Sequence, residues 1–195
     1  MYKLCKTEQS AQRQRQLEEG LLRAMSTVRY EEITVSDLCR QMEIPRKSFY
    51  RYFTSKDGAL HALIDHTLME FEGAVDADVY VPGEKRSLTR DLERFFRFWQ
   101  NRKTLLDALE RSDMSGILIK RAIDYALTEV VFPGRFLPGE SRQTQNHVVM
   151  FGVCGLMSMM LQWHKSGFEE SLQDLARVAA RLLTQPLFPA AGKLL

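Results

Sequence analysis

The stretch from residue 34 to residue 56, with the sequence TVSDLCRQMEIPRKSFYRYFTSK, constrains the fold more than any other part of the chain. Thr34 and Asp37 form a T-x-x-D pattern, whose hydroxyl and carboxylate can satisfy backbone N–H groups left unpaired where a helix begins. Apolar residues then recur at helical spacing as far as Met42. Pro45 can begin a second helix, because its fixed φ suits the first helical position. The stretch therefore predicts two short helices joined by a tight turn.

The second of these helices carries cationic and hydroxyl side chains beside a buried aromatic face. Phe49 and Phe53 lie four residues apart and therefore share that face. The other faces carry Arg46, Lys47, Ser48, Tyr50 and Arg51. Helix, tight turn and basic helix is the arrangement that places a recognition helix in the major groove of DNA. A small helical bundle with a solvated basic face would show the same spacing and is the alternative.

The distribution of charge favours nucleic acid locally, although the chain as a whole does not. The 195 residues carry a net charge of only +2, which is too small to mark a nucleic-acid binder. Between residues 38 and 56, five Lys or Arg residues stand against one Glu, which gives a local net charge of +4. A local cationic patch of this kind is what phosphate binding requires.

The run ITVSDLCRQMEIPRKSFYRYFTSKDGAL resembles the DNA-binding domain of the TetR family of transcriptional regulators. The family pattern is T-[VI]-x-x-[IL]-[AC], a turn, and then [ST]-[FL]-Y-x-Y/H-F-x-[SN]-K. The matching residues are Thr34, Val35, Leu38, Cys39, Ser48, Phe49, Tyr50, Tyr52, Phe53, Ser55 and Lys56. Two departures stand out, because Glu43 occupies the place of a usual Gly and Pro45 that of a usual Ser or Thr. A Glu at positive φ costs about 1 kcal/mol, so we expect the turn to differ slightly.

The resemblance implies a homodimeric repressor whose N-terminal heads bind a palindromic operator in double-stranded DNA. It assigns phosphate contacts to Thr34, Tyr50 and Lys56, and groove contacts to the Arg and Lys side chains of the second helix. The full set of predicted DNA-binding residues is Thr34, Ser36, Pro45, Arg46, Lys47, Ser48, Tyr50, Arg51 and Lys56. The alternative function is a helical interaction protein that keeps the fold without reading an operator.

Hydrophobic periodicity predicts an all-α chain of about nine helices and shows no convincing strand pattern. Besides the two short helices, we expect helices at residues 7–28, 55–75, 88–100, 117–132 and 143–165. Two more are expected around residues 105–109 and after the Ser171–Asp174 capping box. A turn signal at residues 81–84 marks a domain boundary. The prediction is a helix-turn-helix domain at residues 1–75 and a dimerisation and effector-binding domain at residues 76–195.

The helix expected at 143–165 is apolar nearly all round in its middle, which requires burial on several sides. Small residues at every third position, Gly152, Gly155 and Ser158, would permit a close approach. We therefore predict that this helix and the last one pair with their symmetry mates in an isologous dimer. The predicted interface is Val148, Phe151, Gly152, Gly155, Ser158, Met159, Leu175, Val178 and Leu182. A core helix within one subunit is the alternative.

An effector site is implied by the resemblance alone, since TetR-type regulators commonly hold a small molecule in the C-terminal domain. The run FGVCGLMSMMLQWHKSGFEES is loosely similar to that domain. The candidate pocket residues are Phe95, Trp99, Tyr125, His147 and Phe151. Aromatic side chains with a few polar groups suit a ligand of mixed character. A filled helical core explains Phe95 and Trp99 equally well.

Other classes of protein find no support in the sequence. The chain has no nucleotide-binding, zinc-protease or serine-hydrolase motif, so we expect no enzyme, no cofactor and no metal site. The three cysteines form no C-x-x-C pair and indicate a reduced compartment. The N-terminus is too polar for a signal peptide, and the longest apolar run is too short to span a bilayer. These features predict a cytoplasmic protein, and the resemblance implies a bacterial one.

Overall fold

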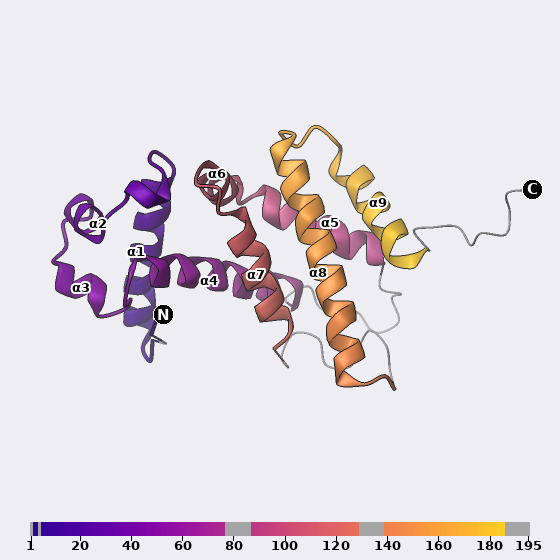
Figure 1. Cartoon of the computed structure of the whole chain (residues 1–195), viewed down its shortest axis with the longest axis horizontal. Coiled ribbons are helices and arrows are strands. Elements are labelled where there is room, and N and C mark those ends of the chain that lie inside the picture. The colour runs from indigo at the N-terminus through magenta and orange to yellow at the C-terminus, as the bar shows by residue number, and fades with distance from the viewer. Residues whose placement is uncertain (1, 4, 77–86, 129–138, 186–195) are drawn as a thin grey trace, which may run out of the picture.

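The structure is a computed structural model that describes residues 2–3, 5–76, 87–128 and 139–185. Within these ranges the chain forms nine α-helices and no strand, which confirms the predicted all-α class (Figure 1). The helices are α1 (Glu8–Met25), α2 (Val35–Gln41), α3 (Arg46–Tyr50), α4 (Lys56–Asp76), α5 (Leu88–Gln100), α6 (Lys103–Arg111), α7 (Ser115–Ala126), α8 (Arg142–Lys165) and α9 (Leu172–Thr184), with a 3-10 turn, η1 (Tyr30–Glu32), after α1. The turn expected at residues 81–84, most of the loop around residues 133–138 and the last part of the helix expected at 117–132 lie outside the described residues.

Side-chain caps fix where several helices begin and end. The hydroxyl oxygens of Thr34 and Ser171 each accept the backbone N–H three residues later, at 3.1 Å, as the two T/S-x-x-D patterns predict. Pro45 lies one position earlier than expected, as the extended residue just before α3. Helix α1 ends at Met25, before residue 28, where the hydroxyls of Ser26 and Thr27 bond to backbone carbonyls of its last turn.

The helices form two groups that α4 joins (Figure 1). At one end of the molecule α1 packs against α4 and α2 packs against α3, whereas at the other α5 lies along α9 and α7 along α8. Helix α4 contacts α1, α5 and α7, so it belongs to both groups. Buried side chains form one continuous cluster through both groups, from Leu21 in α1 and Ile64 in α4 to Phe96 in α5 and Trp163 in α8.

Three further findings concern membrane spans, metal sites and the cysteines. No described helix is both long enough and apolar enough to cross a membrane. Among the described residues, no group of three or more His, Cys, Asp or Glu side chains could hold a metal ion. Cys39 is buried, as its place in the first helix of the motif suggests, whereas Cys154 is half-buried on α8.

Candidate functional site

The turn between α2 and α3 has the geometry of a Schellman helix end. The N–H of Ile44 donates to the carbonyl of Cys39 at 2.9 Å, and the N–H of Glu43 donates to the carbonyl of Arg40 at 3.2 Å. Glu43 adopts a φ of 54°, the left-handed conformation that favours Gly. The turn therefore keeps the backbone of a Gly-containing turn, contrary to our expectation, at a cost of about 1–2 kcal/mol.

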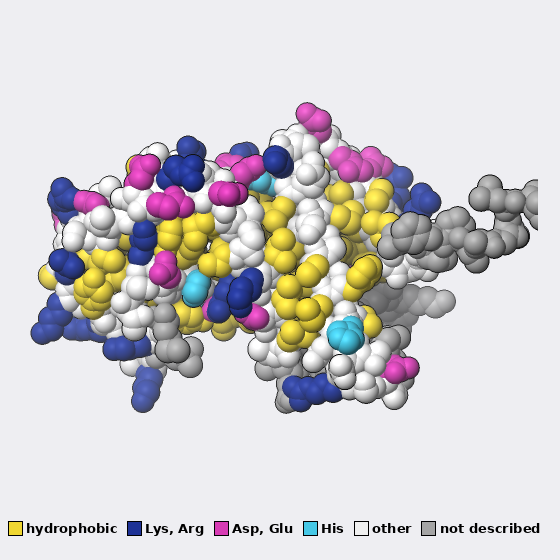
Figure 2. Space-filling view, viewed as in Figure 1, with side chains coloured by type: hydrophobic (Ala, Val, Ile, Leu, Met, Phe, Trp, Pro, Cys, Tyr) yellow, Lys and Arg dark blue, Asp and Glu magenta, His cyan; other side chains and the backbone are white. Residues whose placement is uncertain are grey.

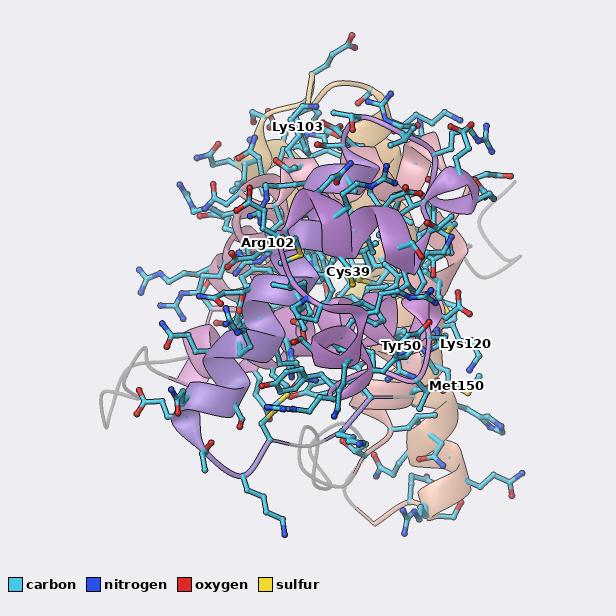
Figure 3. All side chains as sticks on the ribbon, turned by 90° about the vertical axis from the view of Figure 1, so that its left-hand side faces the viewer. Cys39, Tyr50, Arg102, Lys103, Lys120 and Met150 are labelled. Atoms are coloured by element: carbon cyan, nitrogen blue, oxygen red, sulfur yellow. The ribbon has the colours of Figure 1, made fainter. Side chains whose placement is uncertain are left out.

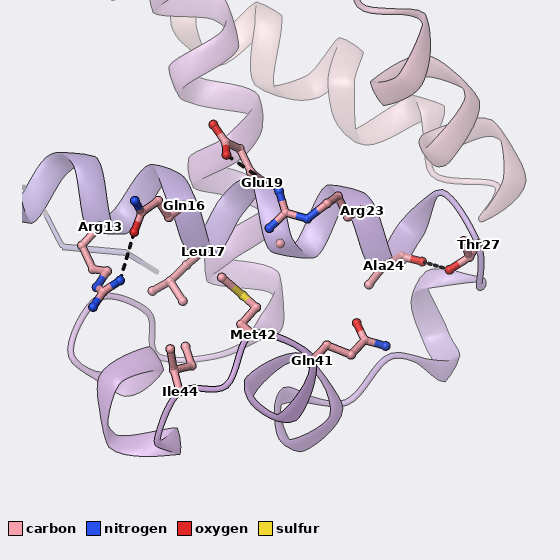
Figure 4. A pocket seen from close by; sticks show the side chains of 11 residues that line it. Arg13, Gln16, Leu17, Glu19, Arg23, Ala24, Thr27, Gln41, Met42 and Ile44 are labelled. Carbon is pink, nitrogen blue, oxygen red and sulfur yellow. Dashed lines mark hydrogen bonds and ion pairs between the residues drawn. The ribbon is translucent and has the colours of Figure 1, made fainter.

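Helix α1 packs against this turn at Gly20, a residue that the sequence analysis did not single out. A Cβ atom built on Gly20 would lie 2.3 Å from Sδ of Met42, which is far too close for two heavy atoms. An open cavity of about 460 Å³ lies beside this contact, between α1 and the α2–α3 turn, and includes Gln41 and Ile44 in its wall (Figure 4). A glycine inside a helix costs about 1 kcal/mol relative to Ala, so Gly20 was a detectable signal of a close approach.

The basic helix α3 is held by its aromatic face. Phe49 is buried, and its ring lies 5.2 Å from that of Phe53 and 5.6 Å from that of Tyr50, measured between centroids. Tyr50 itself is exposed, and the Arg46 guanidinium lies 5.9 Å from the centre of its ring. The hydrophobic contacts thus leave the polar side of α3 facing outward, as the four-residue spacing predicts.

Most of the predicted DNA-binding residues lie exposed at the end of the molecule that α1, α2 and α3 form. Lys and Arg side chains gather there, over α3 and the start of the chain (Figure 2). Figure 3 views the molecule from this end, with Tyr50 labelled. The exposed residues are Thr34, Ser36, Pro45, Arg46, Lys47, Tyr50 and Arg51, whereas Ser48 is half-buried. Seven of the nine predicted residues are therefore exposed, and the two exceptions are Ser48 and Lys56.

The side chain of Lys56 folds back onto the protein. Its Nζ donates to the carbonyls of Tyr30 and Ile33 at 2.5 and 2.7 Å and lies 4.1 Å from the centre of the Tyr30 ring. The Tyr30 hydroxyl donates to Asp57 at 2.6 Å, and burial together with this carboxylate raises the pKa of Tyr30. Lys56 thus ties η1 to the start of α4, and an ammonium group with three donors keeps one for a phosphate.

No family model matches the chain. A curated relative, the HTH-type transcriptional regulator EthR of Mycolicibacterium smegmatis, is 36% identical over 76 residues of the N-terminal part. This match spans 38% of the chain and 35% of EthR, so the chain covers about a third of that relative's length. A solved structure described as a tetR-family transcriptional regulator from Streptomyces coelicolor matches with a TM-score of 0.53, 16% identity and coverage of 89% of this chain and 79% of that one.

The predicted resemblance to the TetR family is confirmed. The fatty acid degradation regulator FadR from Bacillus halodurans matches with a TM-score of 0.59 and 14% identity over 89% of this chain and 98% of that one. The dihydroxyacetone kinase operon activator DhaS matches with a TM-score of 0.56 and 16% identity over 88% and 93%. At these identities the solved structures show that the TetR-like fold extends over both groups of helices, and no more.

The TetR-like C-terminal helices expose an apolar face on α8 and α9. Phe151 is 66% exposed, and Val178 and Leu182 are also exposed. A Cβ atom on Gly152 or Gly155 would meet nothing within 4 Å, so the close approach that we expected at these glycines does not occur within the subunit. Apolar side chains cover this face over α8 and α9 (Figure 2).

The other predicted interface residues are less uniform. Ser158 is exposed on the same face, since positions 151, 155 and 158 follow helical spacing. Val148 and Met159 are half-buried. Leu175 is a correction, because it is only 5% exposed and packs into the core of its own subunit. It cannot offer surface to a partner.

The five candidate effector residues do not line one pocket. Trp99 is 1% exposed, and Phe95 packs against Phe71 with 5.7 Å between ring centroids. In contrast, His147 and Phe151 lie exposed on the outer side of α8. The sequence did not show that these two residues face outward, because a helix that is apolar nearly all round does not indicate which of its sides faces the core. One polar atom nevertheless stands out, since Nε1 of Trp99 is buried without a hydrogen-bond partner among the described residues.

Proposed function

We propose that this protein is a transcriptional regulator that binds a palindromic operator as a homodimer and represses transcription. The observation that carries the proposal is the exposed basic face of α3, which buried Phe49 fixes beside a capped α2. The 36% identity to EthR falls in the N-terminal part, which includes this motif. A DNA-reading regulator has its DNA in the cytoplasm, in agreement with the compartment that the sequence predicts.

The two kinds of DNA contact come from different parts of the motif. Arg46, Lys47 and Arg51 are exposed on α3 and can reach base edges in the major groove, where Arg and Lys donate to guanine. Thr34 and Ser36 lie at the start of α2, where a phosphate would also meet the positive end of the helix dipole.

A homodimer follows from the apolar face of α8 and α9. Large exposed apolar surfaces on a soluble protein mark interaction sites. Open space at Gly152 and Gly155 would let a second copy of α8 approach closely. A two-fold axis through this face would present two copies of α3 to the two halves of a palindrome.

A small-molecule effector is proposed for the aromatic region around Trp99. A buried indole N–H without a partner costs about 1–3 kcal/mol, which a ligand carrying a hydrogen-bond acceptor would recover. For release of the operator, the ligand must bind more tightly to the arrangement that does not bind DNA.

Helix α4 can carry such a change to the DNA-binding end. Its Glu70 receives hydrogen bonds from Arg15 of α1 and from Arg102, which follows α5. Its Glu72 accepts a hydrogen bond from the hydroxyl of Tyr125 in α7. A shift of α5 or α7 would therefore pull on α4 and alter the spacing of the two recognition helices.

A gel-shift experiment with the DNA upstream of the protein's own gene tests operator binding. The expected result is a complex that survives excess unrelated DNA and weakens as salt rises. Equal binding to unrelated DNA would favour the alternative, a helical interaction protein that does not read an operator.

The effector is tested by repeating the titration with candidate compounds on the wild type and on Trp99→Phe, which removes the indole N–H together with part of the ring. Compounds that bind without ever changing operator affinity would contradict the switch. An enzyme is not proposed, and reproducible turnover of a small substrate that is lost on changing one polar residue would oppose this assignment.

A further inference from the structure

The first residues of the chain are bound along the exit of the recognition helix. Tyr2 forms an isolated antiparallel bridge with Phe53, and the N–H of Lys3 donates to the carbonyl of Tyr52 at 3.0 Å. Tyr52 and Phe53 follow within three residues of the last residue of α3, Tyr50. The N-terminal segment therefore lies beside the basic helix.

Side chains hold this segment in place at two further points. Gln14 of α1 is only 2% exposed. Its side-chain Nε2 donates a hydrogen bond to the carbonyl of Lys3 at 3.3 Å, and its Oε1 accepts one from the thiol of Cys5 at 2.8 Å. The hydroxyl of Tyr2 donates to Asp65 of α4 at 2.7 Å. Chain termini usually fray unless they are tied down, and here buried polar groups of α1 and α4 tie down the segment.

The same anchoring directs positive charge outward. The hydroxyl of Tyr2 bonds to Asp65, whereas the side chain of the neighbouring Lys3 is exposed. Lys3 and Lys6 are both exposed, and neither forms an ion pair with any described residue. The backbone of Lys3 bonds to Tyr52, two residues after the end of α3, and this helix and its end carry the exposed Arg46, Lys47 and Arg51.

We propose that Tyr2, Lys3, Cys5 and Lys6 form a strap that contacts the DNA backbone through Lys3 and Lys6 and, through Tyr2, holds the residues after α3 in position. The inference rests on the proposed function, because it adds contacts to the same DNA complex. Lysine ammonium groups on a mobile stem suit phosphates, so the strap contributes affinity without sequence preference.

The charge variant Lys3→Gln/Lys6→Gln tests the backbone contact. Loss of two phosphate contacts in each head makes the slope of log K against log salt shallower by about 2 per head, or about 4 for the dimer, and weakens binding by roughly 60-fold per head at 0.1 M salt. The loss is equal for the operator and for an unrelated duplex. Fluorescence anisotropy across a salt series measures both quantities. The matched control is Lys120→Gln/Lys165→Gln, which removes the same charge from α7 and α8 and is expected to change neither quantity.

The variant Tyr2→Phe separates the positioning role from the charge. It removes the hydrogen bond to Asp65 but no charge, so it weakens operator binding with an unchanged salt slope. Should Lys3→Gln disturb the bridge and lower the melting temperature, Lys6→Gln alone carries the charge test. A charge variant that keeps the wild-type affinity and salt slope overturns the strap but leaves the proposed function standing. A wild type that binds no duplex at all instead overturns the proposed function.

Discussion

Arg121 of α7 grips both carboxylate oxygens of Asp65 on α4. Its Nε donates to Oδ1 at 2.7 Å, and a terminal nitrogen donates to Oδ2, which also receives the Tyr2 hydroxyl. Bidentate geometry of this kind gives the strongest ion pairs. The pair joins α4, which packs against α1, to α7, which packs against α8.

Removing this grip is expected to loosen the two groups of helices from each other. Arg121→Met leaves the nearly buried Asp65 without its counter-charge and should lower the free energy of unfolding by roughly 2 kcal/mol, less than for a fully buried pair. Urea unfolding followed by tryptophan fluorescence measures the change. Lys120→Met breaks an exposed pair with Asp124 on the same helix and should cost under about 1 kcal/mol. Equal effects of the two variants would contradict the assignment.

The left-handed Glu43 gives a prediction of the opposite sign. Glu43→Gly should raise the free energy of unfolding by about 1 kcal/mol, because Gly has no Cβ to strain the observed φ of 54°. Glu43→Ala keeps the Cβ and should bring no such gain. Chemical denaturation of the three proteins compares them directly, and a Gly variant no more stable than the Ala variant would show that the turn is not strained.

The open space at Gly155 gives a prediction about assembly. Gly155→Leu should block the close approach of two α8 helices and shift the protein toward monomer at micromolar concentration. Gly73→Leu is the matched control, because its site on α4 is also open and its gain in helix propensity is the same. Analytical ultracentrifugation provides the measurement. A wild-type protein that already sediments as a monomer would refute the proposed dimer.

Acid stability should depend on Glu70. Burial alone would raise the pKa of this carboxyl, but hydrogen bonds from Arg102 and Arg15 outweigh burial and lower it. The stability that Glu70 contributes is therefore present above its unfolded pKa of about 4.3 and is lost as the pH falls through the lower folded value.

Glu70→Gln should lower the melting temperature at pH 7 and flatten its decline between about pH 5 and pH 3. Glu19→Gln removes an exposed carboxylate on α1 and should leave the shape of the curve unchanged. Melting curves collected across this pH range would contradict the role of Glu70 if those of the Glu70 variant ran parallel to the wild type.

The sequence predicted those features that depend on neighbours along the chain. The caps at Thr34 and Ser171, the buried face of Phe49 and the bounds of α5 follow from local spacing, and the structure confirms them. The all-α class follows from the same periodicity summed over the chain.

The missed features depend on contacts between distant segments. Lys56 matches a family pattern, but no local signal shows that it bonds to the carbonyls of Tyr30 and Ile33. The outward face of α8 was equally hidden, because a nearly uniform apolar helix does not indicate whether Phe151 faces the core or a partner. The strap at Tyr2 arises from backbone pairing across 51 positions, which spacing cannot predict.

The central claim is that α3 reads a DNA sequence, and selection from a random duplex pool tests it most directly. The wild type should enrich a two-fold symmetric sequence, typically bound 10³-fold or more above random DNA. Arg46→Ala/Lys47→Ala should enrich a different sequence or none, whereas Lys56→Ala should enrich the same sequence with uniformly weaker binding. A wild-type pool that shows no enriched sequence, or one unchanged by the α3 variant, would contradict the claim.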